Sequence, residues 1–390
     1  MTLSPEFTPD VENLPHLAIA DLEYIYNRDG PSEAKATAKH QILEIIKKNN
    51  KCASYTHLCA KHGWAVEPDV LKAMTNAYET ELKRIDDSEA QAQTNLIESD
   101  MYDALIERAY AVTNAGDFAQ ASIHITSAIE KPIGAGSRLD LLMLAARIGL
   151  FNFDLSAASD AVLQAKAQLE KGGDWERRNK LKIYDGLVQL AKGNFASATT
   201  SFLSGIATFT ASEVVTFQKF IFYAVLTARM TLPRDRYRSE IIECPEVKQI
   251  SVEDPVLARF TQTLYKCQYR DFFQTLVDIH PVLDNDRYLG THAPTIIKTL
   301  RVLGYRQFLS PVEAVSLRHM GSTFGVSAEF LEAEIYHCIV TQRLSCKLDA
   351  ADGVIISVES NEKGQMLNEV LHQSTLLTDK IQRLFKVMQA

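Results

Sequence analysis

The stretch that decides the fold reads LRHMGSTFGVS (residues 317–327), AEFLEAEIYHCIVTQ (328–342) and SCKLDAADGVIISVE (345–359). Gly325 predicts a tight turn between two helices, and Ser327 is placed to cap the second one. Two strands are predicted at Cys346–Leu348 and Val354–Val358, on either side of the Asp-rich wing DAADG. Helix, turn, helix, strand, wing and strand is the order of a winged-helix module.

A winged helix often reads DNA, but the second helix here lacks the residues for that task. It carries Glu329, Glu332 and Glu334, and no Lys or Arg precedes Arg343. A helix in the major groove needs cationic or amide side chains that face phosphates and base edges. We therefore expect this module to bind protein.

The wing strands offer one way to do so. A strand at the edge of a sheet can pair with the sheet of a neighbouring protein through its backbone. We expect Ile355, Ile356 and Val358 to lie in such an interface.

A six-residue pattern recurs before this module, as GDFAQA at 116–121, FDLSAA at 153–158, GNFASA at 193–198 and, more faintly, RDFFQT at 270–275. The steps between copies are 37, 40 and 77 residues, and apolar residues at spacings of three and four flank each copy. Gly or Asn permits the turn and Ala permits close helix packing. The pattern predicts tetratricopeptide-like hairpins stacked in a solenoid, and the alternative is an irregular helical bundle.

The last segment predicts one amphipathic helix from Glu362 to Ala390. Its apolar residues fall at heptad spacing, which is typical of helices that pack on other helices. An apolar stripe is unfavourable in water, so we expect a partner helix; the alternative is that the segment folds back on the winged helix. The expected interface residues are Leu367, Val370, Leu371, Leu377, Ile381, Leu384, Phe385 and Met388.

The composition of the chain limits the classes of function that we expect. The net charge of −8 and the sequence pI near 5.7 disfavour nucleic-acid binding, because such binding draws on counterion release by cations. No run reaches the roughly 18 apolar residues of a membrane span, and the N-terminus lacks the features of a secretion signal. The six cysteines show no zinc spacing and are expected to be reduced thiols.

No catalytic, cofactor-binding or metal-binding constellation is visible, so no enzyme activity and no cofactor are expected. The chain lacks a phosphate loop, a nucleophile elbow and an H-E-x-x-H helix. His124 and His280 stand alone in apolar helical contexts, where a core or surface histidine is the expected role.

The block Gly172–Lys182 is the other unusual segment. Asp174 is placed to cap a helix, and Arg177, Arg178, Lys180 and Lys182 would give that helix a basic face. A solvated turn, an acidic protein neighbour and a nucleic acid all stay open as interpretations.

These patterns predict an all-α solenoid of tetratricopeptide-like hairpins, then a winged-helix module with a small β-sheet, then a long C-terminal helix. The expected boundaries are a tail and lead-in at 1–32, N-terminal helices at 33–98, repeats at 99–230, a domain at 231–359 that ends in the winged helix (about 315–359), and the terminal helix at 360–390.

Helical hairpins that end in a winged helix resemble the PCI domain. The shared residues are Leu317, Met320 and Phe324–Ser327, then Phe330, Leu331, Glu334 and Ile335, then Gln342–Leu344 and Cys346–Asp349. Within that family the chain is most similar to PCI subunits of the lid of the 26S proteasome regulatory particle. This closer resemblance spans about residues 15 to 388, and the segments that carry it are Pro15–Leu22, Glu81–Asp86, Arg138–Asp140, Arg147–Phe151, Gly172–Lys182 with Tyr184, and Tyr265–Tyr269.

The resemblance implies a non-catalytic scaffold of the proteasome lid, active in ubiquitin-dependent protein degradation in the cytoplasm and nucleus. It makes 231–359 a PCI domain that joins other PCI subunits through the winged helix. It also places the terminal helix in a helical bundle with other lid subunits and the lid deubiquitinase pair, with the ATPase ring as a further partner and no nucleic acid or membrane. The alternatives are a PCI subunit of the COP-nine signalosome and a nucleic-acid-binding PCI protein, which would need a basic winged-helix face.

Overall fold

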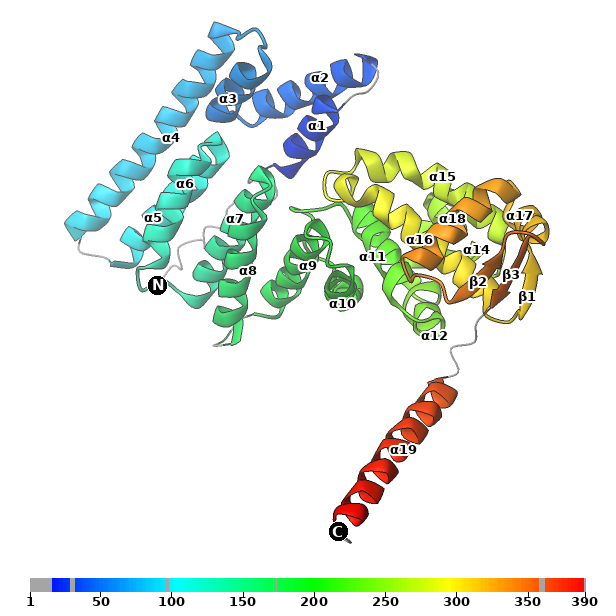
Figure 1. Ribbon diagram of the computed structural model, residues 1–390. Helices are drawn as coiled ribbons and strands as arrows, with labels where there is room; N and C mark the ends of the chain where they lie inside the picture. Colours follow the sequence, from blue (N-terminus) through cyan, green and yellow to red (C-terminus); the bar gives the residue numbers. More distant parts are fainter. Residues whose placement is uncertain are drawn as a thin grey trace. The chain divides into compact units, whose positions relative to one another are not determined.

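The computed structural model describes residues 16–28, 32–95, 98–170, 172, 174–357 and 362–388 (Figure 1). The chain divides into two compact units. The first unit is made of Met1–Tyr265 and Thr275–Ile297, and the second of Lys266–Gln274 and Lys298–Ala390. The division passes through two helices, α15 (Tyr269–Asn285) and α16 (Ala293–Leu309), so each helix contributes to both units.

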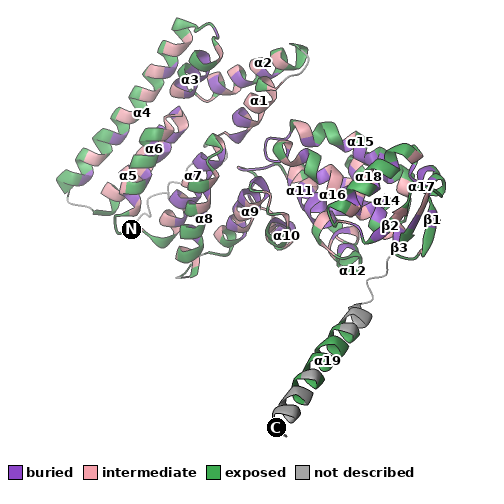
Figure 2. Cartoon of the chain, viewed as in Figure 1, coloured by how far each residue is buried: buried purple, intermediate pink, exposed green. Residues whose placement is uncertain are grey.

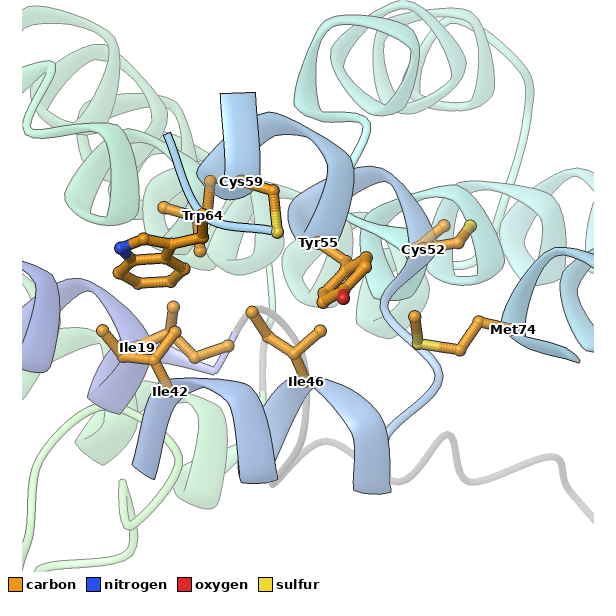
Figure 3. Packing of buried hydrophobic residues seen from close by; sticks show 10 residues of the cluster. Ile19, Ile42, Ile46, Cys52, Tyr55, Cys59, Trp64 and Met74 are labelled. Carbon is orange, nitrogen blue, oxygen red and sulfur yellow. The ribbon is translucent and has the colours of Figure 1, made fainter. Parts of the chain in front are cut away.

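The first unit begins with four helices, α1 (Leu17–Asn27), α2 (Ser32–Lys48), α3 (Cys52–His62) and α4 (Pro68–Asn95). Each turns apolar residues toward a common core, which Figure 3 shows from close by. The buried side chains of this core include Ile19, Ile42, Ile46, Tyr55, Leu58, Trp64 and Met74.

Three helical hairpins follow, formed by α5 (Glu98–Ala115) with α6 (Phe118–Ile129), α7 (Ala135–Asn152) with α8 (Leu155–Glu170), and α9 (Trp175–Ala191) with α10 (Phe195–Leu203). Each turns through one residue in the left-handed region, and its second helix begins two positions later. The turn residues are Gly116 (φ 93°), Phe153 (φ 59°) and Gly193 (φ 78°). The predicted register of the first three repeats is therefore confirmed.

The repeated alanine has the predicted packing role. Ala121, Ala158 and Ala198 are each 0% exposed. The backbone nitrogen of Ala158 lies so near α7 that a Cβ on Gly149 would come within 2.8 Å of it. Only small residues at these positions allow the paired helices this approach.

The fourth copy of the pattern was placed wrongly at residues 270–275. The left-handed residue of that turn is Cys267 (φ 60°), and α15 begins at Tyr269, so the turn lies three residues earlier than predicted. Phe272 is consequently the fourth residue of the helix and is fully buried.

Between the third hairpin and α15 lie one longer helix, α11 (Phe217–Thr231), and several short elements: η2 (Ile206–Thr208), α12 (Arg234–Tyr237), η3 (Arg238–Ile242), α13 (Pro245–Glu253) and α14 (Pro255–Thr263). Three prolines start helices here, with Pro233 at the N-cap of α12 and Pro245 and Pro255 in the first turns of α13 and α14. The turn η4 (Gly290–His292) connects α15 to α16.

The second unit contains β1 (Ala314–Ser316), α17 (Leu317–Phe324), α18 (Ala328–Val340), β2 (Cys346–Asp349), β3 (Val354–Ser357) and α19 (Glu362–Met388). The predicted order of helix, turn, helix, strand, wing and strand is confirmed. Gly325 makes the turn at φ 73°, and the Ser327 hydroxyl accepts a hydrogen bond from the Phe330 N–H at 3.2 Å. Strand β1 was not predicted.

The core of the second unit centres on Phe324, whose ring is fully buried. Its centroid lies 4.9 Å from those of Tyr269 and Phe273, 5.2 Å from Tyr305 and 5.4 Å from Phe308. Helices α15 and α16 thus supply the aromatic side chains against which the winged helix packs.

Candidate protein-interaction surfaces

Among the described helices, α19 has the largest number of exposed apolar side chains. In Figure 2 the residues of this helix whose exposure is described are coloured as exposed along its length. The predicted interface residues of α19 whose side chains are described are Leu367, Val370, Leu371, Leu377 and Ile381. Each of them is between 51% and 62% exposed. The side chains of Leu384, Phe385 and Met388 lie outside the described set. The role of these residues in an interface stays a prediction.

The width of this stripe bears on the kind of helix packing that could cover it. With Leu367 at heptad position a, Val370 and Leu377 occupy d, Ile381 occupies a, and Leu371 lies beside them at e. A seam of a and d alone suits a two-stranded coiled coil, whereas a, d and e together make the wider face of a helix that packs in a multi-helix core. The stripe therefore fits a bundle better than a single partner helix.

One of the three carboxylates of α18 points inward, which the sequence did not reveal. The Tyr305 hydroxyl donates to Glu334 Oε2 at 2.6 Å, and Arg301 Nη2 lies 2.8 Å from Glu334 Oε1. Burial and this hydrogen bond raise the pKa of Tyr305 well above its ordinary value. Glu334, with 9% of its side chain exposed, is thus part of the module's internal packing.

The outer face of α18 is acidic and partly apolar. Glu329 and Glu332 are exposed, and so are Tyr336 (62%) and Val340 (63%). Leu331, Ile335 and Cys338 form the inner face, each 0% exposed. Sequence reasoning missed Tyr336 and Val340 as surface residues; the signal available was that they lie outside the spacing of these three core residues.

The predicted edge pairing through Ile355–Val358 is wrong for the described residues. The sheet order is β1-β3-β2, with both neighbours antiparallel, so β3 is the central strand and both its edges are paired. Ile355 is 0% exposed and belongs to the module's own core, whereas Ile356 is 44% exposed on the other face of the sheet. Val358 lies outside the described residues.

That Ile356 lies in an interface stays a prediction. Because β3 is the central strand, such an interface would use the face of the sheet and not the edge of β3. Ile356 pairs with Ala314 of β1 on one side and Lys347 of β2 on the other, and all three are exposed. This row gives the sheet a small apolar face with one cation. A neighbour would meet the face of the sheet here, and only the outer edges of β1 and β2 are left for strand addition.

The basic block at the start of α9 is largely neutralised within the chain. Asp174 caps the helix as predicted, accepting from the Trp175 N–H at 2.7 Å. Arg177 forms two hydrogen bonds to Asp140, at 2.8 and 2.7 Å, and Lys180 pairs with Glu176 at 3.0 Å.

Lys182 contacts Asn179 Oδ1 at 3.2 Å and the Ser204 carbonyl at 3.3 Å. Arg178 is exposed beside Trp175, which is 62% exposed. A phosphate backbone would have to compete with internal partners for most of these cations, so a solvated turn is the interpretation with most support.

The remaining sequence candidates have ordinary surroundings. His280 Nδ1 lies 3.3 Å from Asp284 Oδ2, one helical turn along α15; the histidine is exposed and the aspartate is half-buried. Among the described residues, no group of three or more His, Cys, Asp and Glu side chains could hold a metal ion. None of the described helices has the length and apolarity required to cross a membrane.

Two family models match the chain. The family described as 26S proteasome subunit RPN7 matches residues 67–240, and the PCI domain matches residues 276–359. The 26S proteasome non-ATPase regulatory subunit 6 homolog of Arabidopsis thaliana is 31% identical over 375 residues, which cover 96% of this chain and 97% of the relative. The 26S proteasome regulatory subunit RPN7 of Saccharomyces cerevisiae is 25% identical and covers 96% of this chain and 94% of its own length.

The chain is less similar to signalosome proteins. COP9 signalosome complex subunit 1 of Schizosaccharomyces pombe is 22% identical, over 69% of this chain and 63% of the relative. Similarity to the proteasome subunits extends across nearly the whole chain, from the N-terminal helices to the winged helix.

Proposed function

Because the chain belongs to the family of 26S proteasome non-ATPase regulatory subunit 6, we propose that it is a non-catalytic scaffold in the lid of the regulatory particle. Its relatives are named regulatory subunits, which agrees with a role in position rather than in chemistry. The protein acts in ubiquitin-dependent degradation, in the cytoplasm and nucleus. The observation that carries this proposal is the exposed apolar stripe of α19, which follows a PCI module.

Helix α19 enters a bundle with helices of other lid subunits, including the lid deubiquitinase pair. The exposed side chains at a, d and e support this, because a stripe of this width needs more than one covering helix. Full burial of an apolar side chain contributes about 1.5–3 kcal/mol, so five such residues supply a large driving force for assembly.

The winged helix joins the chain to neighbouring PCI subunits. Its outer surface offers Tyr336 and Val340 beside Glu329 and Glu332 on α18, and Ile356 on the sheet. The two carboxylates on this outer face of α18 disfavour DNA and favour a protein surface with cations at its rim. The ATPase ring is a further partner. Neither proposed interface involves nucleic acid.

Deletion of residues 361–390 tests the proposal. The truncated chain should keep the thermal stability of the full chain and should fail to enter the complete lid when the lid subunits are co-expressed. Native gels and mass spectrometry of the purified complexes report this directly. A complete lid containing the truncated chain would contradict a role for α19 in the bundle.

Two double substitutions test the apolar stripe and the rest of α19 separately. Leu377→Ala with Ile381→Ala removes two stripe residues and should greatly reduce incorporation. His372→Ala with Thr375→Ala changes heptad positions f and b, away from the stripe, and should leave incorporation unchanged. Equal loss in both pairs would point to general damage to α19.

The winged-helix joint has its own test. Tyr336→Ala with Val340→Ala should weaken co-purification of neighbouring PCI subunits from a chain that lacks α19, whereas Thr341→Ala, also exposed at the end of α18, should not. Unchanged co-purification in the double variant would exclude this face from the joint.

A further inference from the structure

A pocket of about 710 Å³ lies within the first unit, and its lining includes no described residue of α18 or α19. It is bounded by α1, α3, the α5–α6 turn, the α7–α8 turn and residues 287–291. Its apolar walls include Ala20, Leu58, Phe118, Phe151 and Phe153. The size is that of sites which enclose a small organic molecule or a few peptide residues.

The α1 wall is held in place from three sides. Glu23 Oε1 lies 2.7 Å from Lys61 Nζ and 3.0 Å from His62 Nε2, both on α3. Asp21 pairs with Lys219 of α11 at 2.7 Å, and Arg28 pairs with Asp284 of α15 at 2.9 Å. These contacts make α1 a fixed wall of the pocket.

The carboxylates in the lining already have partners. Burial acts to raise the pKa of Glu23, but the hydrogen bonds from Lys61 and His62 outweigh it and leave that pKa lowered, so Glu23 is charged and compensated. Asp117 caps α6 by accepting from the Gln120 N–H at 3.1 Å. Neither group leaves an anion unpaired in the pocket.

Arg287 is different, because it is a buried cation with a donor left over. Arg287 is among the residues that line the pocket, and it is only 7% exposed. Nη2 donates to the carbonyls of Leu150 at 2.6 Å and Phe151 at 2.5 Å, and the guanidinium lies 5.2 Å from the Phe153 ring. Nη1 has no hydrogen-bond partner among the described residues. A buried charged donor without an acceptor is costly, which favours a ligand that brings one.

We propose that this pocket binds a short acidic peptide segment of a partner protein. A carboxylate of the segment accepts from Arg287, and a neighbouring aromatic or aliphatic side chain packs on Phe118, Phe151 and Phe153. Polar side chains of the lining, Asn27, Asn152 and Thr291, suit the peptide backbone. A phosphorylated ligand would bring two charges to a site with one uncompensated cation, and the apolar walls favour peptide side chains.

The test titrates the full chain with acetyl-Phe-Asp-Leu-Asn-amide and with its neutral counterpart acetyl-Phe-Asn-Leu-Asn-amide, by calorimetry. The acidic peptide should bind about tenfold more tightly or better, since hydrogen bonds to charged groups are the stronger ones. Ala53→Trp, on the α3 wall, should abolish binding by filling the pocket. Ala60→Trp, exposed on α3 and outside the lining, is the matched control and should bind as the parent does.

Circular dichroism and thermal melting establish that each variant is folded. If Ala53→Trp is not folded, His57→Glu on the exposed rim replaces it and should weaken the acidic peptide several-fold while sparing the neutral one. Equal affinity for the two peptides, binding that survives a folded Ala53→Trp, or no binding of the acidic peptide would each overturn the proposal. None of these outcomes bears on the lid assembly role, which is measured separately.

Discussion

Helices α9 and α19 have the same kind of sequence and opposite surroundings. Both place apolar residues at spacings of three and four, and both are several turns long. In α9 the residues Leu181, Tyr184 and Leu187 are 3% exposed or less, whereas in α19 Leu377 and Ile381 are more than half exposed. Periodicity therefore predicts an apolar face in each helix and says nothing about which chain covers it.

The contrast recurs on a smaller scale within α18. Its inner residues Leu331 and Ile335 are fully buried, while Tyr336, the next residue along, is 62% exposed. Most apolar residues of the first unit's hairpins pack within that unit, whereas the second unit exposes apolar side chains along α18 and α19. If that division is right, substitutions in the two classes of helix should affect different measurements.

The largest difference is expected between Leu187→Ala in α9 and Leu377→Ala in α19. Loss of a fully buried leucine costs about 2–5 kcal/mol in the free energy of unfolding, because the transfer energy is lost and a cavity is left. An exposed position should change that free energy by about 0.5 kcal/mol or less. Urea denaturation of the isolated chain measures both values.

The two variants should affect lid assembly in different ways. Leu377→Ala should reduce incorporation into the lid without a change in monomer stability, and Leu187→Ala should reduce the amount of folded chain. A destabilisation by Leu377→Ala that equals that of Leu187→Ala would mean that α19 packs on its own chain.

Local chemistry is what made most of the fold predictable. Gly116 and Gly193 provide the left-handed turn, Asp117 the N-cap, and Ala121 and Ala198 the close helix contact, and all of these act within a few residues. The turn at Cys267 was misplaced because a cysteine takes the left-handed position there and Phe272 imitates the repeat pattern in the wrong register.

Features that depend on distant partners could not be read from the sequence. Strand β1 has three residues and exists because it pairs with β3, about forty positions later. The same holds for β3 as the central strand, for the inward direction of Glu334, and for Arg287, whose carbonyl partners are 136 and 137 residues away. Of the candidate surfaces, the α19 stripe was predictable because heptad spacing is local.

The pKa of a lysine should likewise depend on whether its side chain is buried or exposed. Lys51 is 2% exposed, and burial lowers its pKa to about 8, against about 10.4 for an unfolded lysine. The unfolded chain therefore binds more protons between these two values, so stability should rise as pH increases from 8 to above 10. The gain is about 3 kcal/mol if the whole shift is expressed.

Lys51→Met should remove this pH dependence, as measured by urea denaturation at pH 7, 8, 9 and 10. The loss of the hydrogen bond from Lys51 to Asn114 (3.1 Å) offsets part of the variant's advantage at neutral pH. Lys380→Met, at an exposed position of α19, is the control and should follow the parent curve at every pH. A parent curve that is flat from pH 8 to 10 would show that Lys51 is solvated in the folded chain.

Gly186→Ala probes how tightly α9 is packed. A Cβ at this position would lie 2.4 Å from Cε1 of Phe202, which is fully buried and contacts the rings of Phe220 and Tyr223. Overpacking of this kind costs about 1–3 kcal/mol. Gly136→Ala, where the new Cβ would meet only the end of the Arg177 side chain at 3.3 Å, should change stability by about 0.5 kcal/mol or less. Equal effects would mean that the α9–α10 contact is looser than the structure describes.

The smallest effect is expected when one glutamate on each face of α18 is replaced by alanine. Glu334→Ala removes the acceptor of Tyr305 and the partner of Arg301, and should destabilise the chain by about 1.5 kcal/mol, because hydrogen bonds to charged groups are worth roughly that much. Glu332→Ala, on the exposed face of the same helix, should leave unfolding unchanged and alter only the attachment of neighbouring subunits. Thermal melts compare the two variants. If Glu332→Ala destabilised the isolated chain as much as Glu334→Ala does, the outer face of α18 would be part of this chain's own core rather than a surface for a partner.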